Sequence, residues 1–161
     1  MNYYDSISRG YEELHKEEQL KKLELIKKYL NVKRDEKLLD VGCGTGLTTS
    51  PWKCKRYGID PSKKLLEKAK KKYPSIKFRL ASAENIPFKD NVFDVVISIT
   101  AIQNFSDIKK GLEEIKRVGK NRFVLTFLKK SKKKKKIEGL IKNHFKIKEV
   151  IEEEKDLIYI I

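Results

Sequence analysis

The sequence predicts an α/β protein: a doubly wound, mostly parallel sheet of seven strands covered by helices. Two observations support this prediction. Short apolar runs alternate with amphipathic segments of helical period, which is the pattern of βαβ units and therefore of parallel strands. Two further short runs close the chain as a hairpin, so the last strand is expected to be antiparallel.

The N-terminal segment carries no strand pattern. From Glu17 to Leu30, leucine and isoleucine recur on one helical face, with lysine and glutamate elsewhere. We therefore expect an N-terminal helix or lid within residues 1–31 and a core over residues 32–161. A chain of 161 residues has the length of one single domain of this kind.

The strands of the core follow from their apolar patterning. They are expected at 37–41, 56–59, 76–80, 93–100, 122–128, 145–151 and 156–161. The run 93–100 is nearly continuous, as in a strand covered on both faces. In contrast, 76–80 alternates apolar with charged residues and is expected at an edge of the sheet. Helices are expected from Pro61, from Asp107 to Gly119 and over 132–143.

The net charge of the chain bears on the kind of molecule that it binds. The chain has 38 basic and 23 acidic residues, for a formal net charge of +15. Such an excess favours an anionic partner such as RNA. Most of these cations are lysine and few are arginine, which is equally typical of a thermophile's surface. Both interpretations stay open.

The cysteine, histidine and hydropathy patterns argue against a zinc protein, a disulfide-stabilised protein and a membrane-spanning protein. The chain has two cysteines, eleven positions apart, and two histidines, which fit neither a structural zinc site nor a disulfide framework. The longest apolar stretch, Val95 to Ile102, is eight residues and too short to cross a membrane. No signal-peptide pattern opens the chain. We expect an intracellular, cytoplasmic protein with no metal and no membrane contact.

The most informative segment is Asp40-Val41-Gly42-Cys43-Gly44-Thr45-Gly46. Three alternating glycines follow a strand, where open α/β sheets bind ligands and where glycine lets the backbone approach them closely. Asp60 ends the next strand and could accept hydrogen bonds from ribose hydroxyls. Leu47 stands where the dinucleotide fingerprint needs its third glycine, and no Gly-Lys-Ser/Thr follows. The loop is therefore expected to bind a nucleoside without a pyrophosphate.

The segment after this loop leaves little room for a helix. Pro51 and Trp52 interrupt it early, so a helix between the first two strands must be short. Trp52 fits either a core residue over that short segment or a platform that stacks on substrate.

Four segments resemble, in order, the motifs of the class I S-adenosylmethionine-dependent methyltransferases. They are Leu38 to Gly46, Ile59 to Ser62, Ala81 to Phe88 and Asn91 to Val96. The chain is most similar to small members of the ubiquinone-biosynthesis type, whose N-terminal tyrosine pattern is partly matched from Tyr4 to Tyr11. The resemblance implies the Rossmann-like methyltransferase fold and S-adenosylmethionine as the cofactor.

The resemblance also implies roles for individual residues. Asp40 would lie near the methionine amino group of the cofactor, and Asp60 with Pro61 at its ribose. Further cofactor contacts are expected from Gly42, Cys43, Gly44, Gly46, Ser82, Ala83, Glu84, Thr100 and Tyr11. Ser82 stands where the family often has aspartate, so adenine recognition is expected to fall on backbone near Ala83.

For several of these residues, a purely structural role is the alternative to cofactor binding. Asp40 fits a cap that bonds its own backbone amides, and Asp60 a turn residue before Pro61. Cys43 fits a small filler in the loop, and Tyr11 fits packing on the sheet edge as well as a lid over the cofactor.

The methyl acceptor is expected beside Gln103 and Asn104, which follow the fourth buried strand. The alternative is a polar loop that caps the next helix. The segment from Ile97 to Phe105 is similar to the ribosomal RNA guanine-N7 methyltransferases. His15 and His144 lie away from this expected site, and the absence of a clear base favours an already nucleophilic acceptor.

Three functions stay open. Charge, and the absence of an inserted substrate cap, favour a methyltransferase acting on RNA or a translation-linked acceptor. A second is a methyltransferase for a small metabolite such as a quinone precursor. The third, a non-catalytic scaffold, is disfavoured by the intact glycine loop and Asp60.

Two partner surfaces are predicted. Lys129 to Lys136 places seven lysines in eight positions and could bind RNA, or could be a solvated helix face. The edge strand Ile76 to Ala81 is where several translation-related members dock a small zinc-ribbon protein. Lys77 and Arg79 favour the alternative, which is ordinary protection of that edge.

Overall fold

The computed structural model describes the backbone of residues 3–161 and the side chains of residues 13–161. The chain divides into two compact units, Met1–Asn31 and Val32–Ile161, and each is described by itself. The first unit contains one helix, α1 (Tyr3–Lys27), which begins earlier than the sequence pattern indicated and ends three residues before Leu30. Tyr4 and Tyr11 belong to this helix, and their side chains lie outside the described residues.

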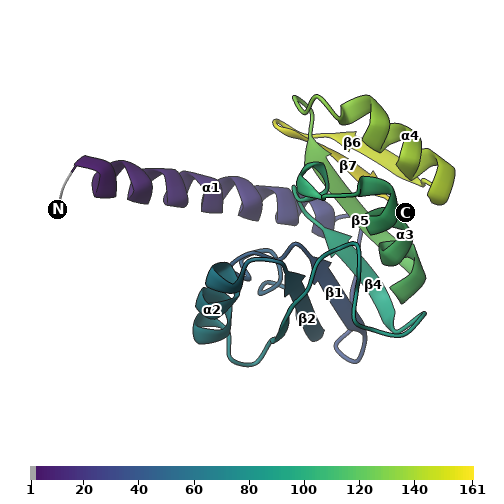
Figure 1. Ribbon diagram of the computed structural model, residues 1–161, viewed down its shortest axis with the longest axis horizontal. Coiled ribbons are helices and arrows are strands. Elements are labelled where there is room, and N and C mark those ends of the chain that lie inside the picture. Colours follow the sequence, from purple (N-terminus) through teal and green to yellow (C-terminus); the bar gives the residue numbers. More distant parts are fainter. Residues whose placement is uncertain (1–2) are drawn as a thin grey trace. The chain divides into compact units, whose positions relative to one another are not determined.

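The second unit is built on the predicted seven-stranded sheet (Figure 1). Its strands are β1 (Lys37–Val41), β2 (Lys55–Asp60), β3 (Lys77–Leu80), β4 (Phe93–Ser98), β5 (Gly119–Leu128), β6 (Glu149–Glu152) and β7 (Asp156–Ile160). Their order is β3-β2-β1-β4-β5-β7-β6. β1 to β5 are parallel, and β7 is antiparallel to both β5 and β6. The predicted fold class is confirmed, with β3 at one edge.

Helices cover both faces of this sheet, as right-handed crossovers require (Figure 1). α2 (Lys63–Lys72) packs against β2 and β3, while α3 (Ile108–Val118) and α4 (Lys134–His144) pack together on the opposite face. Ser62 and Asp107 begin α2 and α3 by accepting backbone N–H bonds with their side chains. The core between the sheet and α3 and α4 includes the fully buried Phe93 and Phe127. None of the helices in the described residues is long and apolar enough to cross a membrane.

Three local expectations need correction. The segment from residue 42 to 54 forms turns with no helix, so even the expected short helix after β1 is absent. β4 ends at Ser98 and not at Thr100, because Thr100 turns the chain with a positive φ of 54°. Gly119 does end α3, but with an extended φ of −92° as the first residue of β5. A Cβ at Gly119 would lie 2.5 Å from the Phe123 ring, so close packing explains the glycine.

Candidate functional site

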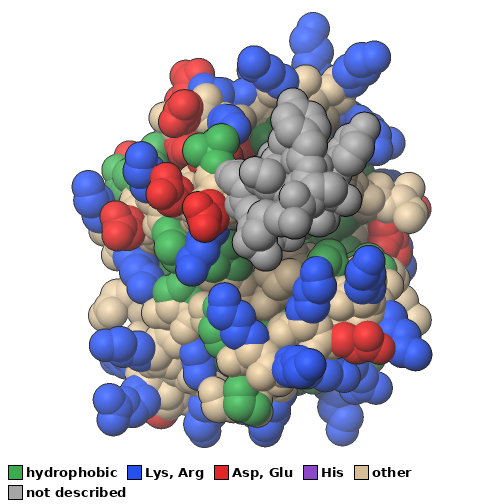
Figure 2. Space-filling model, turned by 90° about the vertical axis from the view of Figure 1, so that its left-hand side faces the viewer, with side chains coloured by type: hydrophobic (Ala, Val, Ile, Leu, Met, Phe, Trp, Pro, Cys, Tyr) green, Lys and Arg blue, Asp and Glu red, His purple; other side chains and the backbone are tan. Residues whose placement is uncertain are grey.

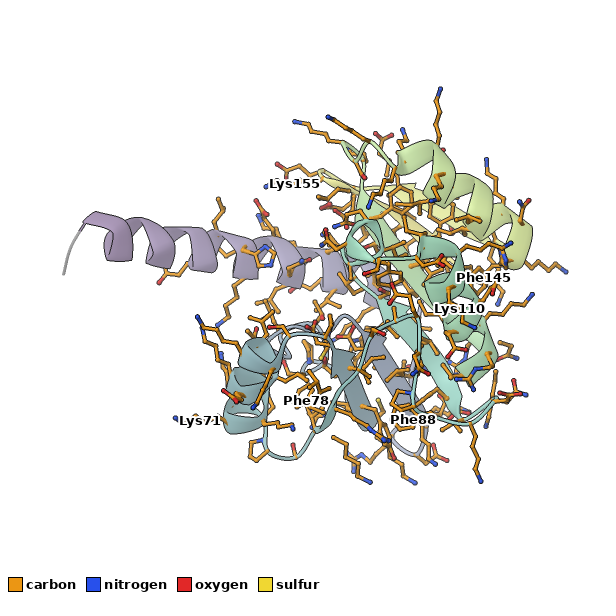
Figure 3. All side chains as sticks on the ribbon, in the orientation of Figure 1. Lys71, Phe78, Phe88, Lys110, Phe145 and Lys155 are labelled. Atoms are coloured by element: carbon orange, nitrogen blue, oxygen red, sulfur yellow. The ribbon has the colours of Figure 1, made fainter. Side chains whose placement is uncertain are left out.

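The glycine loop after β1 is held by protein contacts at its two ends and is open in the middle. Gly42, Gly44 and Gly46 have φ values of 80°, 55° and 86°. A Cβ at Gly42 would lie 2.7 Å from the Cβ of Ala101, and one at Gly46 would lie 2.8 Å from the ring of Phe78 on β3 (Figure 3). Among residues 13–161, a Cβ at Gly44 would meet nothing within 4 Å. The space above Gly44 is therefore available to a ligand.

Asp60 ties this loop to the start of α2. Its carboxylate is largely buried at the end of β2. Oδ2 accepts the Gly44 N–H at 2.9 Å, and Oδ1 accepts the Ser62 N–H at 2.9 Å. Each carboxylate oxygen can accept one more hydrogen bond. The turn role and the ligand role that the sequence offered for Asp60 are thus compatible in one side chain.

Asp40, in the middle of the sheet, is fully buried. Its Oδ2 accepts the hydroxyls of Thr48 at 2.6 Å and Thr49 at 2.8 Å, so its partners are side chains and not its own backbone amides. Its Oδ1 has no hydrogen-bond partner within residues 13–161. Burial raises the pKa of this carboxyl to about 6; the two threonines act in the opposite direction and the charge of Asp60 in the same direction. A cationic N–H donor at Oδ1 would relieve the cost of burying that oxygen.

The residues predicted to lie near adenine form a turn after β3. Ser82 O accepts the Asn85 N–H at 3.2 Å, and the carboxylate of Glu84 accepts the Asp107 N–H at 3.0 Å, before α3. Ala83 is buried and packs against Gly111 of α3. A Cβ placed on Gly111 would lie 3.4 Å from the Cβ of Ala83.

Cys43 lies in the glycine loop with its side chain directed at β2. A Cβ at Gly58 would lie 2.9 Å from its Sγ, and burial raises the pKa of the thiol far above its usual range. The geometry supports the filler interpretation. Pro61, between Asp60 and Ser62, is exposed beside the loop.

Arg117 of α3 anchors the connection between β3 and β4, a role that was not predicted from the sequence. Its guanidinium donates to the carbonyls of Ile86 at 2.9 Å and Phe88 at 2.8 Å and to the carboxylate of Asp90 at 2.9 Å. Glu114 accepts the Ile86 N–H at 3.0 Å, and its hydrogen bond with Arg117 holds its pKa below the usual range. An arginine and a glutamate three residues apart on one helix are the signal that could have indicated this clamp.

Residues 100–105, which we name the acceptor loop, follow β4 and contain the short 3-10 turn η1 (Ile102–Asn104). Gln103 Nε2 donates to the Thr100 carbonyl at 2.9 Å, and its Oε1 is buried without a hydrogen-bond partner among residues 13–161. Asn104 is exposed. The close approach of Ala101 to Gly42 brings the acceptor loop against the glycine loop.

Trp52 and His144 were also considered from the sequence, and the structure places both side chains. Trp52 is buried, and its Nε1 donates to the Thr48 carbonyl at 3.1 Å, so it is a packing residue of the turn segment. His144 ends α4, where its Nδ1 lies 2.8 Å from the Leu140 carbonyl. Because α4 starts near the acceptor loop and runs for eleven residues, His144 lies about 15 Å along the helix from that start.

Comparison with known proteins gives a consistent family. A model described as a methyltransferase domain matches residues 39–127, more than half of the chain. Demethylmenaquinone methyltransferase of Chlorobaculum tepidum is 42% identical over 96 residues, covering 57% of this chain and 40% of that protein. The ubiquinone/menaquinone biosynthesis C-methyltransferase UbiE of Campylobacter jejuni is 32% identical over 116 residues, covering 66% of this chain and 49% of that protein. The chain thus spans less than half the length of these curated relatives.

A solved structure supports the same fold. The crystal structure of an S-adenosylmethionine-dependent methyltransferase from Aquifex aeolicus superposes with a TM-score of 0.75 at 21% identity, covering 86% of this chain and 87% of that one. The resemblance stated from the sequence motifs is confirmed at the level of the family. The chain belongs to the methyltransferase domain family.

Proposed function

We propose that this protein is an S-adenosylmethionine-dependent methyltransferase. The observation that carries the proposal is the pairing of Asp60 with the Gly44 amide beneath the open space above Gly44. The residues present fit this cofactor. Asp60 retains capacity for ribose hydroxyls, and the buried, unpaired Oδ1 of Asp40 suits an ammonium group. When bound, S-adenosylmethionine would supply a methyl group activated by a positively charged sulfur.

The chain's own contribution is to place two reactants in line. The glycine loop admits the cofactor at close range, and Asp60 fixes that loop through its two backbone hydrogen bonds. Ala101 sets the distance between the glycine loop and the acceptor loop. Gln103 and Asn104 would orient the acceptor. His144 lies a helix length away, which favours an acceptor that supplies its own nucleophilic atom.

Of the acceptor classes, the relatives' names support a small metabolite of the quinone-precursor type. RNA, which the sequence favoured, remains the second candidate because of one contact. Lys133 Nζ donates to the Gln103 carbonyl at 3.1 Å, so the lysine segment borders the acceptor loop. Figure 2 shows lysine and arginine side chains distributed widely over the face it views, with the acidic ones gathered mainly on one side.

Cofactor binding is the first test. S-adenosylmethionine should raise the melting temperature, because a ligand that binds only the folded state stabilises it. NAD should not. Asp60→Ala should weaken binding by about 10- to 100-fold, as expected for loss of a charge-assisted hydrogen bond. Equal affinity in wild type and variant, measured by calorimetry, would remove the ribose assignment.

The acceptor is identified by transfer of labelled methyl from the cofactor. Reduced 1,4-naphthoquinone and fractionated RNA are offered in parallel, with Asp60→Ala as the control that should transfer less label at a limiting cofactor concentration. Label in the organic extract supports the metabolite class. Nuclease-sensitive label in the precipitate supports RNA and contradicts the first candidate.

A further inference from the structure

Thr100, the first residue of the acceptor loop, has a backbone conformation that threonine seldom adopts. Its φ of 54° lies in the left-handed region, which is unfavourable for a β-branched residue. Such conformations persist only where the surroundings enforce them, and they occur preferentially at functional sites.

A directional chain of hydrogen bonds holds Thr100 and ends at a buried carboxylate. The Thr100 N–H donates to Thr126 Oγ1 at 2.8 Å. Because that hydroxyl accepts from Thr100, its own proton is directed to Asp156 Oδ2, at 2.8 Å. Thr100 Oγ1 donates to the same Oδ2 at 2.6 Å. Thr126 and Asp156 are both fully buried. The backbone N–H and the side chain of Thr100 are thus restrained from one point.

The register of the sheet places this group on the same face as Asp40. Asp40 pairs with Ile97 and Ile97 with Val124, so the three residues share a face. Thr126 lies two positions beyond Val124 on that face. Asp156 lies at the start of β7. Its backbone N–H donates to Glu153 Oε1 at 2.9 Å, and this hydrogen bond helps to fix its position. Through Asp156, β7 therefore reaches the residue Thr100 that follows the carboxyl end of β4.

The conformation of Thr100 sets the positions of two neighbours. Its carbonyl accepts Gln103 Nε2 at 2.9 Å, which orients the amide of that side chain. The next residue, Ala101, is the one that stands against Gly42 of the glycine loop. A change of φ at Thr100 would move both contacts together.

We propose that Asp156 is a positioning residue for methyl transfer: through Thr126 and Thr100 it holds the acceptor loop in register with the glycine loop. The inference rests on the proposed methyltransferase function. It predicts that Asp156 acts on the acceptor step, through its hydrogen bonds to Thr126 and Thr100, and not on cofactor binding.

The test is a double-mutant cycle between Asp156 and Thr100. Asp156→Ala should lower kcat by at least about 10-fold, with the cofactor dissociation constant changed by less than about 3-fold. The acceptor is reduced 1,4-naphthoquinone or RNA, whichever takes the label. Because glycine adopts a positive φ without strain, Asp156→Ala in a Thr100→Gly background should lower kcat by less than about 3-fold. Equal losses in the two backgrounds would overturn the proposal.

Conservative variants keep the test interpretable if Asp156→Ala does not fold. Asp156→Asn retains an oxygen that can accept from both threonines and should lose less activity than Asp156→Ala. Thr100→Ser keeps the hydroxyl and should lose less activity than Thr100→Val, which has the shape of threonine but no hydroxyl. Asp94→Asn, at the start of β4, is the matched control and should lower stability with kcat unchanged. Similar kcat in Thr100→Ser and Thr100→Val would contradict the proposal.

Hydrogen exchange supplies a measurement that needs no acceptor. Peptides covering residues 100–105 should exchange faster in the Asp156 variants than in wild type, with peptides of β1 and β2 unchanged. Unchanged exchange in residues 100–105 would overturn the positioning role. A wild-type protein that transfers no label to any acceptor would contradict the proposed function, while the exchange experiment would still decide the role of Asp156.

Discussion

Asp40 is a buried carboxyl group with one oxygen that lacks a hydrogen-bond partner among residues 13–161, an arrangement that lowers stability unless a ligand pairs with that oxygen. A carboxyl group buried in the sheet, with two hydroxyl donors on one oxygen and none on the other in the described residues, resists ionisation. Its pKa of about 6 lies above that of an unfolded aspartate, which is near 3.8. Protonated Asp40 therefore contributes to the free energy of unfolding of the free protein, and this contribution is fully present below about pH 4. It is lost as the pH rises from there through about 6, because the folded state must then ionise a buried carboxyl group.

We expect Asp40→Asn to remove this pH dependence. The variant should gain stability relative to wild type between pH 4 and 7, by about 3 kcal/mol for a shift of this size. It should also bind S-adenosylmethionine about 10-fold or more weakly, because the neutral amide cannot pair with an ammonium group. Urea unfolding across this pH range and calorimetry at pH 7.5 measure the two effects. A difference in stability that does not change with pH would contradict the assignment of the titration to Asp40.

In wild type, affinity for the cofactor should rise with pH between 5 and 7. The ionised carboxylate is the form that attracts an ammonium group, and Asp40 becomes ionised over this interval. Calorimetry at half-unit steps, with Asp40→Asn as the control that should show no such rise, tests the sign.

Gln103 and Asn104 are expected to affect turnover and not cofactor affinity. Gln103→Ala removes the side chain whose Oε1 is buried and unpaired in the described residues, and Asn104→Ala removes an exposed amide. Each should lower kcat by about 10-fold or more with the cofactor dissociation constant nearly constant. If both variants bind the cofactor poorly, the acceptor loop serves the cofactor site and the acceptor lies elsewhere.

At the scale of elements, the segment Lys129–Lys136 leads from β5 into α4 beside the acceptor loop. If about four of its lysines each neutralise a phosphate of single-stranded RNA, log affinity should fall with log salt at a slope near −3. Replacing Lys133 to Lys136 by glutamine should flatten the slope and weaken all sequences alike. Filter binding over a salt series provides the measurement.

The matched control for this experiment lies on α2. Glutamine at Lys68, Lys70, Lys71 and Lys72 removes the same charge from an exposed helix end. It should leave the slope nearly unchanged. RNA binding that responds equally to both substitutions would reflect net charge alone, and the lysine segment would then be a solvated helix face.

The edge strand β3 is the second element whose role stays a prediction. We propose that it docks a small zinc-ribbon protein. Its Leu80 is one of the exposed large apolar side chains. Lys77 and Arg79 lie over the rings of Tyr57 and Phe88, at 5.3 and 5.9 Å from the ring centroids, and are equally suited to protecting the edge.

A pull-down from native extract tests this edge. Mass spectrometry and zinc analysis should identify a small zinc protein with wild type and not with Leu80→Lys. Val150→Lys places the same change on β6, at the opposite edge, and should retain the partner. Recovery of no small zinc protein with wild type supports edge protection.

At the scale of the whole molecule, a net charge of +15 acts against the compact state through self-repulsion. Salt screens charges over about 10 Å at 0.1 M. The melting temperature of the free protein should therefore rise between 20 and 300 mM sodium chloride, to be checked by differential scanning fluorimetry. A fall would mean that the ion pairs, such as Arg117 with Glu114, outweigh the repulsion.

Much of the fold follows from local patterns that a chain carries in its sequence. Apolar runs of five or six residues specify buried parallel strands, and Ser62 and Asp107 specify where α2 and α3 begin. The glycine loop and Asp60 could be identified because their function requires particular residue types at a particular spacing. These features depend on neighbours close along the chain, which is why the sequence by itself determined the fold class and the family.

The remaining features depend on contacts between distant segments, so only the tertiary structure decided them. Asp156 and Thr126 stand within apolar strands, and an acid buried in a strand is a signal that some partner must exist. The sequence does not say that the partner is Thr100, 56 residues away. Likewise, the clamp of Arg117 on the Ile86 and Phe88 carbonyls exists only because α3 lies beside that connection. Hydrogen bonds and close contacts are short-ranged, and the partners across such distances are fixed only when the sheet has brought its strands together.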